Sequence, residues 1–266
     1  MKAAVVTGDP LTSNVAMAQA LMDQVERDDA VQLPAVSTAE LGALGALQGA
    51  LIDDDAWSWW IGKPEAERGQ LAAMALKFLV HRGLVDPPDA DTDQAEHTER
   101  AERADEVALR VRPLLAMILA GRLRSAFVAV RRDGAGSSPD RMRLYGIAEE
   151  GSGLKAVLAE EATGKHASGF GPGYQYALVS PAEAATSLVR WVKRSPGRRL
   201  AIGRRPVKVI DVYRPNTGAG PTLSHLTVTP VSDGFRVERD SDGSPVEGDE
   251  DLLGRLLADL LAGRTP

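Results

Sequence analysis

The chain has 266 residues, of which 44% are hydrophobic and 26% are charged, and its formal net charge at pH 7 is −6. This composition is that of an ordinary globular protein, long enough for one large core or two modest ones. Without cysteine, the chain has no disulfide, thiolate zinc site or cysteine nucleophile. The first apolar run is too short for a signal peptide and no stretch approaches the roughly 18 apolar residues of a membrane span, so we expect a cytoplasmic protein.

Charge is distributed unevenly along the chain. Residues 89–106 hold eight acidic side chains against Arg100 and Arg103, so this segment alone accounts for the net charge of −6. Residues 190–208 hold eight basic side chains and no acidic one. Two interpretations stay open, namely an interaction surface or two solvated segments of opposite sign that attract each other.

The first predicted elements are a short strand over Lys2–Thr7 and a helix over Val15–Arg27, with Asn14 as its N-cap. A strand, a turn and a helix in this order suggest a nucleotide-binding fold. The turn, TGDPLTSN, has one glycine, whereas a phosphate-binding turn needs several so that the backbone can approach the pyrophosphate. Helices rather than alternating strands are expected to follow, so a nucleotide-binding fold is not predicted.

Residues 37–40 (STAE) form a capping-box pattern that starts a predicted helix over Thr38–Ile52. Three glycines in this helix lower its propensity and leave room for another helix to pack closely. Asp53–Asp55 is expected to end it. In the following WSWWI sequence, an extended backbone places Trp57 and Trp59 on one face and Trp60 on the other. We expect Trp57 and Trp59 in the core and Trp60 at the surface.

The clearest N-terminal helix is Glu65–Arg82, which follows Pro64 and precedes Gly83, a residue suited to the left-handed position after a helix. Together with the preceding elements it predicts a mainly helical, winged-helix-like subdomain over residues 1–88. One stripe at helical spacing predicts the buried face of this helix. The stripe consists of Leu71, Met74, Ala75, Phe78, Leu79 and Arg82.

Residues 89–106 are expected to be an acidic linker or the start of a charged helix. The next segment, Glu106–Leu119, is amphipathic, and Pro113 within it predicts a kink or a break. From Ser125 onwards, short β-type segments separated by Gly, Asp and Ser turns replace the helical spacing, which predicts antiparallel hairpins.

The C-terminal half repeats one pattern, in which strands are followed by an amphipathic helix. The predicted fold class is α+β, with the N-terminal helical subdomain followed by two antiparallel sheet units that each end in a packed helix. The leucine stripe of the last helix is expected to cover the second sheet. Unit 107–195 has strands at 126–132, 142–149, 154–160 and 174–180 and a helix at 182–193; unit 196–266 has strands at 207–214, 224–231 and 234–239 and a helix at 249–261.

No catalytic motif accompanies this scaffold. The four histidines are scattered without a second ligand at metal spacing, and Asp53–Asp55 lacks the alternating ligands of a cation loop. No nucleophile elbow, phosphate-binding loop or zinc-protease motif occurs. We therefore expect a non-enzymatic protein without metal or cofactor, although catalytic residues that meet only in three dimensions would leave no motif.

Candidate partner-binding residues are an accessible tryptophan, a glycine-rich hairpin loop and four arginines of the basic segment. An alternative function is a DNA-binding transcription regulator that reads DNA with Glu65–Arg82 and senses a ligand or partner with its β domain. The acidic segment that follows this helix would repel a duplex, so nucleic acid is not the expected partner. The candidates are Trp60, Gly169, Phe170, Gly171, Arg198, Arg199, Arg204 and Arg205.

The order of elements resembles that of the EspG family. The resemblance is carried by MALKFLVHRGLVD at 74–86, a charged stretch, a helix ending in AMILAGR at 116–122, and the strands AFVAVRR and MRLYGIAEE. EspG proteins are cytoplasmic chaperones of actinobacterial type VII (ESX) secretion, with α/β folds of internal two-fold pseudo-symmetry, and they bind PE–PPE heterodimers.

This resemblance covers residues 37–195 in organisation and implies a binding protein without catalytic residues. The implied partner is another protein, such as a helical hydrophobic secretion substrate, and no membrane association is expected. The chain departs from the family in its added strand-and-helix start and in the absence of a second copy of the helical segment 37–83.

Overall fold

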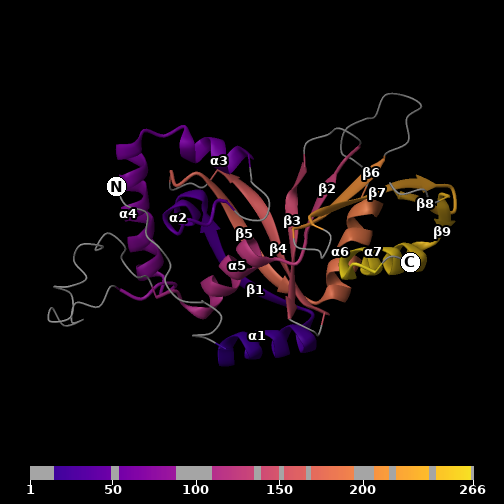
Figure 1. Cartoon of the computed structure of the whole chain (residues 1–266), viewed down its shortest axis with the longest axis horizontal. Coiled ribbons are helices and arrows are strands. Elements are labelled where there is room, and N and C mark those ends of the chain that lie inside the picture. Colours follow the sequence, from indigo (N-terminus) through magenta and orange to yellow (C-terminus); the bar gives the residue numbers. More distant parts are fainter. Residues whose placement is uncertain are drawn as a thin grey trace. The chain divides into compact units, whose positions relative to one another are not determined.

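The computed structural model describes residues 15–48, 54–87, 110–134, 139–149, 153–165, 169–194, 207–215, 220–239 and 244–264. These residues form seven helices and one nine-stranded sheet, which confirms the predicted α+β class (Figure 1). The helices are α1 (Val15–Asp28), α2 (Thr38–Ala43), α3 (Asp54–Ile61), α4 (Glu65–His81), α5 (Pro113–Arg124), α6 (Pro181–Lys193) and α7 (Glu250–Ala262). The strands are β1 (Ala30–Ser37), β2 (Val128–Arg132), β3 (Pro139–Glu149), β4 (Gly153–Lys165), β5 (Pro172–Val179), β6 (Lys208–Arg214), β7 (Thr222–Val231), β8 (Gly234–Arg239) and β9 (Val246–Gly248).

The chain divides into two compact units, and each unit is built from several segments. Helices α2 to α5 belong to the first unit, whereas β2, β3, the strands β6 to β9 and the helices α6 and α7 belong to the second. Unit 1 comprises Met1–Leu21, Leu33–Leu123 and Ala162–Gln175, and unit 2 comprises Met22–Gln32, Arg124–Glu161 and Tyr176–Pro266.

The strand order of the sheet is β1-β5-β4-β3-β2-β6-β7-β8-β9. Outward from the central β2–β6 pair, β3, β4 and β5 follow on one side and β7, β8 and β9 on the other. Each run of four strands is followed along the chain by one helix, α6 after β5 and α7 after β9. The same succession of strands and helix therefore occurs twice, with one short strand, β9, that was not predicted.

Antiparallel pairing decides which side chains share a face of this sheet, because directly paired residues point the same way. The predicted hairpins β2–β3, β3–β4 and β7–β8 are antiparallel. At the centre, Val130 of β2 pairs with Asp211 of β6, and Asp211 pairs with His225 of β7. These three residues mark one face of the sheet, called the front face, and the alternate residues mark the other, called the helix face.

Helices α6 and α7 pack on the helix face. Leu253, Leu257 and Leu261 of α7 lie in one buried cluster with residues of β6, β7 and β8, such as Ile210 and Leu226. The leucine stripe of the last helix therefore covers the second run of strands, β6 to β8, as predicted for the second sheet unit. Burial of these side chains from water is the main stabilising contribution of such a core.

Arg214, at the end of β6, holds the C-terminal end of α7. Its guanidinium donates hydrogen bonds to the carbonyl oxygens of Leu260 and Leu261, the latter over 3.2 Å. A cation at this end of a helix also interacts favourably with the helix dipole. Burial lowers the pKa of Arg214 from its usual value, because desolvation disfavours the charged form.

A buried carboxylate joins three strands on the front face. The side chain of Glu160 accepts hydrogen bonds from the hydroxyls of Tyr145 (3.1 Å) and Tyr176 (2.8 Å). It also forms an ion pair with Arg143 at 3.2 Å, and Glu160 is 0% exposed. Because both carboxylate oxygens have donors, the charge can stay buried within the sheet.

In unit 1, the predicted capping box at the start of α2 is present. The Ser37 side chain accepts a hydrogen bond from the backbone amide of Glu40, and the Glu40 carboxylate accepts one from the backbone amide of Ser37. Arg82 then joins the end of α4 to this corner, since it donates to Glu40 Oε1 at 2.8 Å and to the carbonyl oxygen of Ala35 at 2.6 Å.

Several N-terminal elements differ from the prediction. The strand β1 lies between two predicted helices, in a subdomain expected to be mainly helical, and it was not predicted. It lies at the sheet edge, where the missing amide of Pro34 is tolerated. The helix α2 ends at Ala43, well before Ile52. At Pro113 the structure agrees with the predicted break and not with a kink, because α5 begins at this proline, which fits the first helical turn. The predicted strand at 2–7 and the whole acidic segment 89–106 lie outside the described residues.

The tryptophan segment is a helix, α3, and not the extended backbone from which the faces of the three tryptophans were predicted. Asp54 and Asp55 lie in its first turn, where acidic side chains favour a helix, so the aspartates begin an element instead of ending one. Because successive residues of a helix are rotated by about 100°, Trp57, Trp59 and Trp60 point in different directions. All three are of intermediate exposure, so the expected division into core and surface tryptophans does not occur.

The buried face of α4 is rotated from the predicted stripe. Its buried residues are Gly69, Ala72, Ala75 and Leu79, three of which are small. Ala72 and Ala75 pack in one cluster with alanines of α2, because small side chains allow two helix backbones to approach closely. Two residues of the predicted stripe, Met74 and Phe78, are instead 50% and 47% exposed.

Substitution of Glu160 tests the buried network. Glu160→Ala should lower the free energy of unfolding by about 3–5 kcal/mol, because it removes the buried carboxylate that Arg143 and two tyrosine hydroxyls share. The exposed neighbour provides a matched control, Glu161→Ala, which should leave that free energy nearly unchanged. Denaturant unfolding measures both, and equal effects of the two variants would contradict a stabilising role for the network.

Candidate functional site

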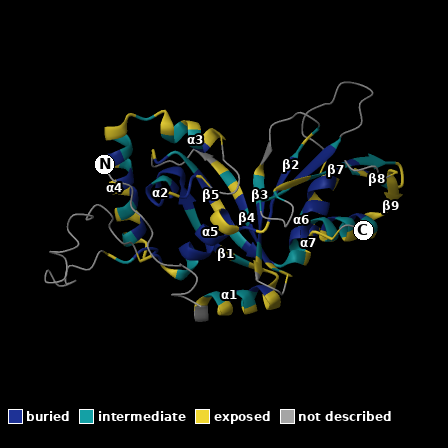
Figure 2. Ribbon diagram, in the orientation of Figure 1, coloured by how far each residue is buried: buried dark blue, intermediate teal, exposed yellow. Residues whose placement is uncertain are grey.

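The front face of the sheet changes from buried to exposed between its two halves. Over β2 to β4 its residues are buried, as illustrated by Val130, Tyr145 and Leu158, each at most 5% exposed. Over β7 and β8 the same face consists of exposed and half-buried residues (Figure 2). We call this part the open face, and its residues are Tyr213, Leu223, His225, Thr227, Thr229, Arg236 and Glu238.

The open face lies on a packed support. The alternate residues of the same two strands, Leu226, Val228 and Val237, are at most 4% exposed and belong to the core under α6 and α7. Leu223, by contrast, is 64% exposed. The open face is therefore a preformed surface, one side of a sheet whose other side is closed by packing.

A charged cluster lies at the border between the buried and the open part of the front face. The Asp211 carboxylate accepts from His225 Nδ1 at 2.5 Å and forms an ion pair with Arg132. The Asp211 side chain is 7% exposed and the His225 side chain is 28% exposed. A buried carboxylate that holds one imidazole nitrogen fixes the orientation of the ring.

The remaining charges of the open face are also paired. Arg236 and Glu238, neighbours on β8, form an ion pair at 2.9 Å. The open face therefore combines apolar and threonine side chains with cations whose charge is already balanced within the protein. A surface that binds the phosphates of a nucleic acid needs an excess of positive charge, which these described residues do not supply.

Three basic residues in the described part of the segment 190–208 are similarly paired. Arg190 pairs with Glu183 at 2.9 Å, and Lys193 pairs with Glu250 at 2.6 Å. Lys208 is 2% exposed and forms an ion pair with Asp133, while its Nζ lies 4.6 Å from the centre of the Trp191 ring. These contacts fasten α6 and β6 within unit 2. The predicted partner-binding arginines Arg198, Arg199, Arg204 and Arg205 lie outside the described residues.

The other predicted partner-binding residues come together in unit 1. Phe170 is buried among alanines of α2 and α4, and its carbonyl oxygen accepts a hydrogen bond from the backbone amide of Ala39 at 3.1 Å. Its ring meets Phe78 edge-on, with 5.2 Å between ring centres. The loop is therefore docked onto the helices, and Gly169 is its exposed residue.

Glycines allow the two tryptophans to approach this cluster closely. A Cβ at Gly171 would lie 2.8 Å from the Trp59 ring, and one at Gly42 would lie 2.8 Å from the Trp60 ring. Gly42 thus permits the close approach of another helix that was predicted for this glycine-rich segment. Because Trp60 covers Gly42, it contributes to the packing of α3 on α2.

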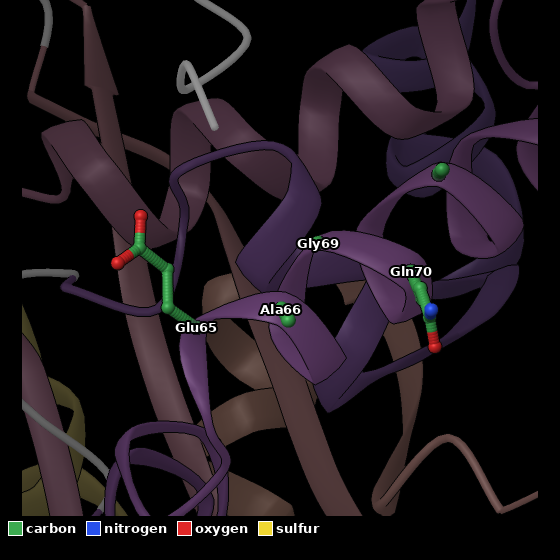
Figure 3. A pocket seen from close by; sticks show the side chains of 5 residues that line it. Glu65, Ala66, Gly69 and Gln70 are labelled. Carbon is green, nitrogen blue, oxygen red and sulfur yellow. The ribbon is translucent and has the colours of Figure 1, made fainter.

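A hollow of about 660 Å³ lies beside the first half of α4 (Figure 3). Its described lining consists of Glu65, Ala66, Gly69, Gln70 and Ala73, all from this helix. One carboxylate and one amide among small side chains do not form a catalytic constellation. Arg82, one of the residues considered for DNA reading, is held by Glu40 at the far end of α4.

The described residues contain no group of three or more His, Asp or Glu side chains that could hold a metal ion. None of their helices is long and apolar enough to cross a membrane. No protein-family model matches the chain, and no curated protein matches it.

Substitutions in the 169–171 loop test the Trp59 contact. Both Gly169 and Gly171 have a positive φ, +74° and +80°, so alanine strains the backbone at either position. Only at Gly171 would the new methyl group also collide with an indole ring. Gly171→Ala should therefore lower the free energy of unfolding by about 1–3 kcal/mol more than the control Gly169→Ala. Denaturant unfolding compares the two, and an equal loss would contradict the close contact.

Proposed function

We propose that the protein is a non-enzymatic, protein-binding chaperone that holds a helical, partly apolar partner against the open face. The observation that carries this proposal is the change of the front face from buried over β2 to β4 to exposed over β7 and β8. A rigid surface of this kind, in which an exposed leucine and a tyrosine lie among polar residues, is suited to a protein interaction site.

The chemistry of the open face favours a protein partner. Leu223 and Tyr213 offer apolar and aromatic contact area, and tyrosine is enriched in protein interfaces. The charged side chains Arg132 and Arg236 already have carboxylate partners. A partner can cover such a surface without leaving an unpaired charge in the interface, which would otherwise oppose binding.

The resemblance to EspG proteins suggests which partner this is. Those chaperones bind PE–PPE heterodimers in the cytoplasm of actinobacteria before type VII secretion. A helical substrate with an exposed apolar end would fit a flat sheet face with one prominent leucine. We therefore propose a PE–PPE-type heterodimer as the partner of this chain.

Co-expression with a PE–PPE-type pair encoded near this gene tests the proposal. The wild-type chain should co-elute with the pair in size-exclusion chromatography. Leu223→Asp and Thr227→Arg should each raise the dissociation constant at least about tenfold, because charge or bulk enters the centre of the contact. The matched control is Leu123→Asp on α5, where the leucine is also exposed, at 45%, but lies outside the open face.

The outcomes separate two errors. If the wild-type chain binds and all three variants bind equally well, the chaperone function stands and the open face is the wrong site. If the wild-type chain binds no such pair, or turns over a substrate, the proposed function is wrong.

A further inference from the structure

The open face carries a titratable group among its contact residues. His225 lies on β7 between Leu223 and Thr227, with both of which it shares a face of the sheet. Its Nδ1 lies 2.5 Å from an oxygen of Asp211, which is also paired with Arg132. The His225 side chain is 28% exposed, so it can exchange a proton with the solvent while the face is free. A partner that covers Leu223 and Thr227 also covers this imidazole.

The charged groups that face His225 from the neighbouring strands are balanced among themselves. Arg132 is paired with Asp211, and Arg236 is paired with Glu238. Helices α6 and α7 pack against the opposite side of β7, so their charged side chains do not face this imidazole. The charged and titratable groups on the described front face of β2, β6 and β8 are Arg132, Asp211, Tyr213, Arg236 and Glu238.

Protonation of His225 changes the charge balance of this cluster. With a neutral imidazole, Nδ1 donates its hydrogen to the Asp211 carboxylate, whose charge is cancelled by Arg132. With a protonated imidazole, the same carboxylate faces two cations, and the cluster carries an excess positive charge. Histidine is the side-chain type that ordinarily changes its charge between about pH 5 and 8. His225 is the only histidine among the described residues of the open face.

A bound partner removes water from this cluster. Water stabilises an excess charge better than a covered interface does, so the face is harder to cover when His225 carries the extra proton. The Asp211 contact persists in both protonation states, so the proton changes the charge of the face while the sheet beneath it stays fixed.

We propose that the open face holds its partner while His225 is neutral and releases it when His225 takes up a proton. The sign follows from linkage, because the free chain binds this proton more readily than the complex does. Affinity is therefore fully present above the titration range of the imidazole and is lost as the pH falls through it. The inference rests on the proposed function, since it concerns the regulation of the same face.

The pH dependence of partner binding tests the proposal. The full chain is immobilised, and the dissociation constant of the PE–PPE-type pair encoded near this gene is measured at about pH 7.5 and about pH 5.5. The wild-type dissociation constant should rise about tenfold between these two values, because at the lower pH about one proton must leave for each partner bound.

His225→Asn isolates the contribution of this imidazole. An asparagine amide can donate to Asp211 as Nδ1 does, but it takes up no proton in this pH range. Whatever the affinity of this variant, the ratio of its two dissociation constants should lose the tenfold change attributed to His225. The matched control is His81→Asn, which replaces an exposed histidine at the end of α4, outside the open face, and should keep the wild-type ratio.

Isothermal titration calorimetry in two buffers of different ionisation enthalpy counts the released protons directly. At about pH 5.5, the wild-type chain should release roughly one proton more per bound partner than His225→Asn does. Protons contributed by the partner cancel in this difference. Circular dichroism should show that the variant keeps the wild-type fold, and His225→Gln provides the same comparison if it does not.

The outcomes separate failure of this inference from failure of the proposed function. If the wild-type chain binds with equal affinity at both pH values, binds more tightly at the lower one, or shows the same pH dependence as His225→Asn, this inference is wrong and the proposed function stands. If the wild-type chain binds no such pair even at the higher pH, the proposed function is wrong and this inference fails with it.

Discussion

The antiparallel pairing of β2 with β6 is the interaction on which the rest of unit 2 depends. It joins two runs of four strands into one sheet, and its register puts Val130 beside Asp211 on the front face and Arg131 beside Ile210 on the helix face. Since side chains alternate along a strand, a slip of one residue would turn Asp211 into the hydrophobic core and Ile210 out of it. The cost of burying that carboxylate among leucines makes the observed register strongly preferred.

From this register follow both the core and the open face. The helix face is apolar along β6, β7 and β8, and α6 and α7 cover it. On the front face, the residues near β2 are buried, and each buried acid has partners. Glu160 is held by Arg143 and two tyrosines, and Asp211 is held by Arg132 and His225. Farther out, threonines and Leu223 remain in contact with solvent. A sheet supported on one side and accessible on the other is a surface suited to binding.

The second exposed surface, along α4, has a different physical origin. Here small residues are buried, because Ala72 and Ala75 allow α4 to approach the alanines of α2. Met74 and Phe78 are rotated outward as a result, and Phe170 fills the space beside Phe78. Helix propensity and apolar spacing alone favour the opposite orientation, in which the largest side chains are buried.

The elements that the amino-acid sequence predicts correctly are those governed by local rules. The capping box at Ser37 depends on hydrogen bonds between side chains and the backbone three residues away. The helix after Pro64 and the elements from residue 126 onwards depend on turn residues and on the spacing of apolar residues over a few positions. The helix α3 was missed because a short apolar run fits both the helical and the strand period of side chains. The strand β1 was missed because Pro34 is acceptable only in an edge strand, and the edge is defined by the assembled sheet.

What the sequence determines by itself is therefore the α+β class, the repeated succession of strands and helix, and the absence of cysteine chemistry. What only the tertiary structure decides is which surfaces remain exposed and which charges become partners. Strand pairing brings together residues from different strands, such as Glu160 with Tyr176 and Asp211 with Arg132 and His225. Likewise, Leu223 and Met74 carry no signal in the sequence that separates them from core residues, since exposure depends on what packs against each face.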